Sequence, residues 1–318
     1  MGWIIALCAL LVLLIVILVF SFFAYRLVFY VPSKHKEDVY AIPDDEQYAH
    51  DRDKMISLIK EIDTLPYERV YCIAKDGIAL SGRYYHTNDN APIQIQFPGY
   101  KGSSIRDFCG GCKLARELGF NVLLVDQRAH GMSEGHTITF GVKERYDCLC
   151  WIDYAINRFG KDIQIYLAGV SMGGATILMA SEFDLPKNIR GIVADCPFTT
   201  PPAIIKKVCK DRGYNPKIIY PFIYLGALLF GHFKLNAANS SEAVTHTDIP
   251  VLLIHGEDDK FVPCEMSKEI KNNCVSYSEL HTFPGAGHGI SFIVNHERYK
   301  NIASSFLEYC KNNKIENN

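Results

Sequence analysis

Ser171 stands in the pentapeptide G-V-S-M-G at 169–173, the residue pattern best suited in this chain to present a nucleophile. A short apolar run at 165–168 precedes it, and small and apolar residues that suit a helix follow it. In that context G-x-S-x-G predicts a sharp strand–turn–helix junction that exposes the serine hydroxyl. The N–H of Met172 would start the helix and point to where an oxyanion forms. The motif alone leaves open a glycine-rich turn with an incidental serine.

A serine nucleophile needs a general base and an acid that orients the base, and two later loops offer them. Asp259 lies in H-G-E-D-D-K-F-V-P, just after a strand predicted at 251–254, and Asp258 is its adjacent rival. His288 lies in G-A-G-H-G, after a strand predicted at 277–283. Because open α/β sheets place their sites at the carboxyl ends of strands, we expect Ser171, Asp259 and His288 to meet there.

Strand and helix patterns alternate through most of the chain, which predicts an α/β fold with a mostly parallel sheet covered by helices on both faces. A hairpin with Asp-Gly at its turn opens this pattern at 69–85. The other predicted elements are strands at 93–97, 122–125 and 192–194 and helices at 105–118, 143–158 and 302–309.

One segment, about 197–246, contains helical material but no strand signal. Its part at 218–233 is strongly apolar and aromatic, yet it is short for a membrane span and contains Pro221. Two interpretations stay open. The segment is either a lid over the strand ends that meets an acyl chain, or an extra helix pair packed on the core.

These motifs resemble those of the α/β-hydrolase superfamily, close to its serine aminopeptidase and monoacylglycerol-lipase-like branch, over about 67–309. G-x-S-x-G, H-G-x-x-D-x-x-V-P and G-x-G-H-G follow each other in the family's order of serine, acid and histidine. The resemblance implies Ser171 as nucleophile, Asp259 as acid, His288 as base and no cofactor. Some members of the fold take their acid from the preceding strand, which makes Asp195 a further rival.

The resemblance also extends to two loops on the amino-terminal side of Ser171. In F-P-G-Y at 97–100 it implies the N–H of Tyr100 as the second oxyanion donor beside Met172, with Pro98 where the family often has histidine. The segment D-Q-R-A-H-G-M-S at 126–133 is similar to the family's D-x-R-G-x-G-x-S turn, with Ala129 in place of glycine. We interpret this turn as structural.

Composition bounds the function. The chain has 318 residues, 48% hydrophobic and 21% charged, as expected of a globular protein with one large domain. A net charge of −2, without clusters of basic and aromatic residues, argues against nucleic acid as a partner. The 11 cysteines are an odd, scattered set typical of a reducing compartment. Cys109 and Cys112 form a lone CxxC without a second pair at zinc spacing, and we interpret them as two thiols on a helix face.

The amino-terminal residues 3–24 carry no charge and are long enough for a helix that crosses a bilayer. No basic residue precedes the run and no cleavage site follows it, so we favour a retained anchor over a signal peptide. Arg26, Lys34 and Lys36 follow the span, which predicts the remainder of the chain on the cytoplasmic face. We therefore divide the chain into an anchor (1–25), a tether and lead-in (26–66) and a hydrolase domain (67–318), and expect a variant starting near Val31 to be soluble and active.

Taken together, the sequence predicts a membrane-anchored serine hydrolase that cleaves small acyl or lipid-like carboxylic esters through an acyl-enzyme. A peptidase or an acyl-thioesterase would use the same three residues. A catalytically silent hydrolase-fold binding protein is the alternative from another functional class. The pattern specifies neither the physiological substrate nor the oligomeric state.

Overall fold

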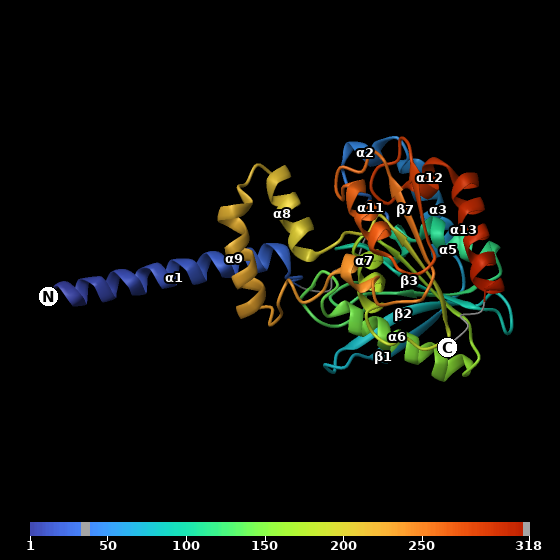
Figure 1. The fold of residues 1–318 in the computed structure, drawn as a ribbon, viewed down its shortest axis with the longest axis horizontal. Coiled ribbons are helices and arrows are strands. Elements are labelled where there is room, and N and C mark those ends of the chain that lie inside the picture. The colour runs from blue at the N-terminus through green and yellow to red at the C-terminus, as the bar shows by residue number, and fades with distance from the viewer. Residues whose placement is uncertain (33–38, 314–318) are drawn as a thin grey trace.

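The computed structural model describes residues 1–32 and 39–313, and an eight-stranded sheet lies at its centre (Figure 1). The strand order is β1-β2-β4-β3-β5-β6-β7-β8. Only the pairs β1–β2 and β2–β4 are antiparallel, so the predicted mostly parallel sheet is confirmed. The strands are β1 (Glu68–Ile73), β2 (Ala79–Tyr85), β3 (Ile93–Phe97), β4 (Asn121–Val125), β5 (Ile165–Val170), β6 (Ile189–Asp195), β7 (Val251–Gly256) and β8 (Ser278–Phe283).

Helices cover both faces of the sheet because its central strands present apolar side chains to both faces. Tyr166 of β5 belongs to a hydrophobic cluster with α3, α5 and α13, whereas its neighbour Leu167 belongs to another with α6 and α7. The helices of the body are α2 (Glu46–Ala49), α3 (Arg52–Asp63), α4 (Ser104–Asp107), α5 (Cys109–Glu117), α6 (Glu144–Phe159), α7 (Met172–Ala180), α10 (Ser240–Ala243), α11 (Cys264–Asn273), α12 (Ser291–Val294) and α13 (His296–Asn312).

Part of the segment predicted as a tether and lead-in packs against the body. Ile59 and Ile62 of α3 are fully or almost fully buried, in the cluster that also contains Cys112 of α5. Residues 33–38, which include Lys34 and Lys36, lie outside the described residues. The lead-in from α2 to α3 therefore contributes to the core.

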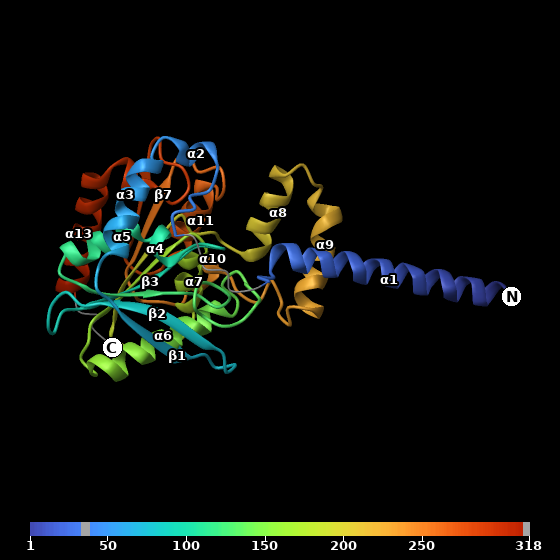
Figure 2. The same cartoon turned by 180° about the vertical axis from the view of Figure 1, so that it is seen from behind.

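The amino-terminal helix α1 (Gly2–Val28) projects away from the body (Figures 1 and 2). Within the described residues it is the one helix long and apolar enough to cross a membrane, with a mean hydropathy of 3.4 over its most apolar window. Only 6% of that window is buried, which distinguishes α1 from the core helix of a soluble protein. Its last turn does join the body, since Tyr25 is buried and its hydroxyl lies 2.7 Å from Thr137 Oγ1.

The segment without strands forms two helices, α8 (Pro201–Asp211) and α9 (Pro216–Leu229), which stand on the side of the body from which α1 leaves (Figures 1 and 2). α9 packs across α1, with the rings of Phe20 and Phe222 5.8 Å apart. A third hydrophobic cluster joins Ile223 of α9 and Phe29 to Met172 at the start of α7. The helix pair thus bridges α1 and the amino-terminal end of α7, an arrangement that neither earlier interpretation described.

Candidate active site

Ser171 stands at a sharp junction between β5 and α7, as the G-x-S-x-G pattern predicts. Its backbone has φ 54° and ψ −116°, a left-handed φ that is costly for a residue other than glycine. A Cβ on Gly169 would lie 2.4 Å from the backbone of Gly173, and a Cβ on Gly173 would lie 1.8 Å from Phe97 O. Gly169 is therefore required where β5 meets α7, and Gly173 is required where α7 passes the end of β3, because neither place has room for a side chain.

Asp259 and His288 form a direct pair at the carboxyl ends of β7 and β8. Asp259 Oδ2 lies 2.7 Å from His288 Nδ1, and the Asp259 side chain is fully buried. Asp259 Oδ1 accepts hydrogen bonds from the N–H groups of Phe261 and Val262, both at 2.8 Å. This geometry directs one carboxylate oxygen to the backbone and the other to the imidazole.

The charges of this pair stabilise each other. Burial alone would raise the pKa of Asp259, but the positive charges and hydrogen bonds of His288 and His255 outweigh it and lower that pKa. Burial alone would lower the pKa of His288, but the charge of Asp259 and its hydrogen bond outweigh it and raise that pKa. A carboxylate that remains ionised is thus available to orient the imidazole and stabilise the imidazolium.

The loop that carries His288 lies against the junction that carries Ser171. A Cβ on Gly289 would lie 3.3 Å from Val170 Cγ1, one residue before Ser171. The thiol of Cys196 lies against the backbone N–H groups of both Ser171 and Gly289, and burial raises the pKa of that thiol well above its ordinary value. The structure therefore brings the serine and histidine segments together around an un-ionised cysteine.

The two rival acids lie elsewhere. Asp258 is exposed, and its backbone N–H donates to Ala286 O at 3.0 Å. Asp195 is buried beside Tyr299, and burial raises the pKa of its carboxyl to about 6. The imidazole of His288 is hydrogen-bonded to Asp259, the acid at the motif position.

The two expected oxyanion donors flank Ser171. Met172 is the first residue of α7, so its N–H has no acceptor one turn earlier in the helix. The loop that contains Tyr100 passes next to the serine, since a Cβ on Gly99 would lie 3.4 Å from Ser171 Cβ. The N–H of Gly99 donates to Asp107 Oδ2 at 2.9 Å, and the N–H of Lys101 donates to His130 Nε2 at 2.9 Å. These two hydrogen bonds fix the backbone on both sides of Tyr100.

Pro98 and the turn at 126–133 also belong to this support. Pro98 O accepts a 2.6 Å hydrogen bond from Gln127 Nε2. Ala129, which stands where the resembling family has glycine, has φ 61°. Arg128 makes a buried bidentate pair with Asp147 at 2.7 and 2.6 Å, as expected of a structural turn.

Two supporting residues escaped the sequence analysis. Gln47, on α2, accepts a 2.8 Å hydrogen bond from the backbone N–H of His288 through its Oε1. His255 is fully buried beneath Asp259, with Nδ1 2.7 Å from Ser267 Oγ and Nε2 2.8 Å from Val262 O. The H-G-E-D-D pattern places His255 near the acid, but no local signal connects Gln47 with the histidine loop.

The cysteines and carboxylates do not suggest a separate metal centre. Among the described residues, one set of potential ligands, Cys196, Asp259 and His288, has donor atoms within 4.8 Å of one another. The short Asp259–His288 hydrogen bond already accounts for two of them. Cys109 and Cys112 are free buried thiols, and burial raises the pKa of each to about 12.

Comparisons with known proteins agree with this architecture. The family model described as the alpha/beta hydrolase fold matches residues 96–217. The chain belongs to the α/β-hydrolase superfamily. It is 25% identical to the uncharacterized protein YqkD of Bacillus subtilis, over 60% of this chain and 63% of that protein. It is 26% identical to the lysophosphatidylserine lipase ABHD12 of Danio rerio, over 57% of this chain and 45% of that one.

A solved structure extends the likeness of fold. An esterase from Pyrococcus furiosus superposes with a TM-score of 0.65 at 24% identity and covers 79% of this chain and 93% of its own. The chain spans less than two thirds of the length of YqkD and of the zebrafish lipase. The superfamily assignment therefore rests on the fold and the matched central region, which contains Ser171 and Tyr100 but neither Asp259 nor His288.

Proposed function

We propose that this protein is a membrane-anchored serine hydrolase that cleaves carboxylic esters of acyl or lipid-like substrates. The observation that carries the proposal is the arrangement at one sheet edge. Ser171 stands on a strained strand–helix junction, and the buried Asp259–His288 pair lies on the loops beside it. Esterase and lipase are also the activities named for the Pyrococcus and zebrafish proteins, which favours esters over amides.

In the proposed reaction Ser171 Oγ attacks the acyl carbonyl while His288 Nε2 takes the hydroxyl proton. The carbonyl π electrons move to oxygen, and the N–H groups of Met172 and Tyr100 stabilise that oxyanion. The tetrahedral intermediate then collapses and expels the alcohol, which receives the proton from His288. The acyl group remains bound to Ser171 Oγ as an acyl-enzyme. Water then adds to the acyl carbonyl while His288 takes its proton. The bond to Ser171 Oγ breaks, that oxygen receives the proton from His288, and the carboxylic acid is released. Asp259 holds the Nδ1–H tautomer throughout.

A fluorophosphonate probe tests this proposal, because it labels only an activated serine. The full-length chain in detergent should react with the probe and hydrolyse p-nitrophenyl esters, and Ser171→Ala should do neither while it keeps its circular dichroism spectrum. An unlabelled wild-type protein would instead indicate a silent binding protein. Parallel assays with thioester and aminoacyl-amide substrates would reveal a thioesterase or a peptidase.

The membrane part of the proposal rests on the apolar length of α1 and on Arg26 in its last turn. The exposed apolar surface of α1 suits a bilayer, and by the positive-inside rule Arg26 favours the cytoplasmic side for the hydrolase domain. Alkaline carbonate should fail to extract the full-length protein from membranes. Protease added to intact cells should leave the domain uncut, and cleavage there beside an intact internal control would reverse the orientation.

A further inference from the structure

We propose that the helix pair α8–α9 lies on an anionic lipid bilayer, next to the point where α1 enters it. The proposal rests on the anchoring role of α1 proposed above. It adds a second membrane contact, made by residues 201–230, that holds the candidate active site at the bilayer surface. Four features of the pair lead to this conclusion: the position along α1 at which α9 packs, the direction of α9 across α1, the exposed apolar surface of the pair and its positive charge.

The exposed apolar part of α1 fits one bilayer and ends where α9 crosses it. Large apolar side chains are exposed from Trp3 to Phe23. At ~1.5 Å per residue, this part is ~30 Å long, which equals the thickness of the hydrocarbon core. From Tyr25 onward one face of the helix packs on the protein, where Tyr25 and Phe29 are buried, and its exposed face carries the charged Arg26 beside Leu27. The bilayer boundary on the side of the body therefore falls near Phe23.

α9 meets α1 at that boundary and runs across it instead of alongside it (Figures 1 and 2). The contact is tight, because a Cβ on Gly226 would lie 2.5 Å from Ser21 O. Phe222 packs near Phe20, and Phe230 lies 5.3 Å from Phe22 between ring centroids. When α1 follows the bilayer normal, α9 lies close to the bilayer plane, as an interfacial helix does.

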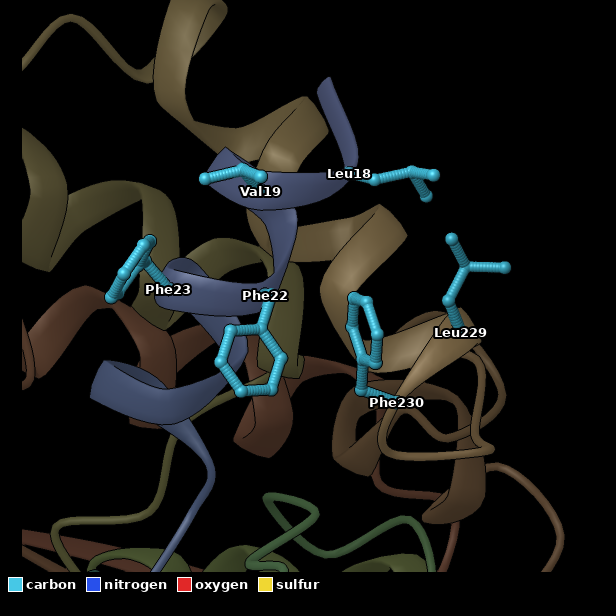
Figure 3. Close-up of a pocket in the computed structure, with 6 residues that line it drawn as sticks. All are labelled: Leu18, Val19, Phe22, Phe23, Leu229 and Phe230. Atoms are coloured by element: carbon cyan, nitrogen blue, oxygen red, sulfur yellow. The ribbon is translucent and has the colours of Figure 1, made fainter. Parts of the chain in front are cut away.

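The surface that α9 shares with α1 is apolar and open. A groove with a volume of about 430 Å³ lies between the two helices. Its lining residues, drawn in Figure 3, are Leu18, Val19, Phe22, Phe23, Leu229 and Phe230. At the amino-terminal end of α9, Ile218 is 60% exposed. Such a patch is costly in water. Because the lipid-facing side of α1 forms one wall of the groove, acyl chains that surround α1 are the natural occupants.

The charge of the pair selects the kind of bilayer. Residues 201–217 contain one acidic residue, Asp211, although the whole chain has a net charge of −2. The five basic residues there are Lys206, Lys207, Lys210, Arg212 and Lys217. Lys207 pairs with Asp211, but no carboxylate of a described residue lies within 4.0 Å of the cationic nitrogens of the other four. Basic residues beside an apolar helix favour an anionic leaflet.

Depth-dependent fluorescence quenching tests the contact in the full-length protein. The chain has two tryptophans, Trp3 and the buried Trp151, so Trp3→Phe leaves a shielded background. The full-length protein that carries both Trp3→Phe and Ile218→Trp is reconstituted into liposomes of equimolar phosphatidylcholine and phosphatidylserine. Lipids brominated near the head-group end of the acyl chain should reduce the fluorescence of the tryptophan introduced at position 218 at least twofold. Val275→Trp is the matched control: Val275 is 65% exposed but precedes β8, at the other end of the sheet, and should not be quenched.

The outcomes separate the parts of the proposal. If the tryptophan introduced by Ile218→Trp is quenched by aqueous acrylamide but not by brominated lipid, the membrane contact is overturned. Omitting phosphatidylserine, or introducing Lys206→Gln, Lys210→Gln and Lys217→Gln together, should reduce the lipid quenching of that tryptophan. Unchanged quenching in both tests would overturn the requirement for anionic lipid. In the otherwise unaltered chain, quenching of Trp3 by deeply brominated lipid reports α1 alone, so a failure of the helix pair and a failure of the anchor are distinguishable.

Discussion

Replacing Asp259 by asparagine should abolish most of the activity through the tautomer of His288. The argument begins with the two oxygens of the carboxylate. Oδ1 accepts two backbone hydrogen bonds, from Phe261 and Val262, and Oδ2 accepts one from His288 Nδ1. An asparagine retains one oxygen and replaces the other by an NH₂ group, which donates hydrogen bonds and accepts none.

The backbone decides which oxygen the amide retains. With the NH₂ group in the place of Oδ1, two buried N–H donors would lose their acceptor, at a cost of ~1–3 kcal/mol each. The amide therefore keeps its oxygen toward Phe261 and Val262 and turns its NH₂ group to His288. The imidazole must then accept at Nδ1 and carry its proton on Nε2, where it is unable to take the proton of Ser171. In triads of this kind such a change lowers kcat by ~10⁴.

The adjacent acid supplies the control. Asp258→Asn changes an exposed side chain and should leave kcat/KM within about twofold, as surface substitutions generally do. The assay compares fluorophosphonate labelling rates and p-nitrophenyl butyrate turnover of both variants with the wild type. Near-ultraviolet circular dichroism confirms that each variant is folded. Equal losses at 258 and 259, or full activity of a folded Asp259→Asn variant, would refute the reasoning.

Three further predictions concern the base, its support and the helix crossing. The kcat/KM of the wild type should fall as the pH drops through the pKa of His288, because only the neutral imidazole accepts a proton. This acid limb should lie above pH ~6.5, the ordinary pKa of histidine, because Asp259 raises the pKa of His288. A pH–rate profile with its acid limb below that pH would contradict the pairing. Gln47→Ala should lower kcat ~5- to 150-fold with little change in KM, since the N–H of His288 loses an acceptor worth ~1–3 kcal/mol. Gln47→Glu should restore kcat because it supplies the acceptor again. Equal kinetics of the wild type and both variants would exclude a positioning role. Gly226→Ala should lower the Tm in detergent, although alanine favours helices, because its Cβ would collide with Ser21 O. A raised Tm would show that α9 does not pack closely against α1.

Much of the fold could be read from local patterns. Apolar runs bounded by turn residues located the strands to within a few residues, because buried parallel strands need continuous apolar sequence. Helix α13 was harder: it begins at His296, not near 302, since its first turns are polar and only the Asn295 cap marks the start. The helix predicted at 105–118 is interrupted at Phe108, between α4 and α5.

The site divides in the same way. The positions of Ser171, Asp259 and His288 relative to strand ends follow from short motifs, and the structure places all three at one edge of the sheet. Gln47 was beyond reach, because it meets His288 across 241 residues and its own surroundings resemble a polar lead-in. The partner of α9 was beyond reach for another reason: an apolar surface indicates that something covers it, without indicating what.

The packing of α1 connects the proposed anchor to the candidate oxyanion site. The backbone of Tyr100 lies in the loop beside Ser171, but its hydroxyl donates a 2.6 Å hydrogen bond to Val28 O, in the last turn of α1. Phe29 fills a fully buried space with its ring 5.3 Å from that of Phe233. A variant that starts near Val31 would lose both the acceptor for Tyr100 and a large core side chain, a class of loss worth ~3–5 kcal/mol. The structure therefore argues against the boundary expected from the sequence. The end of α1 belongs to the hydrolase body, and a soluble variant must begin before Tyr25.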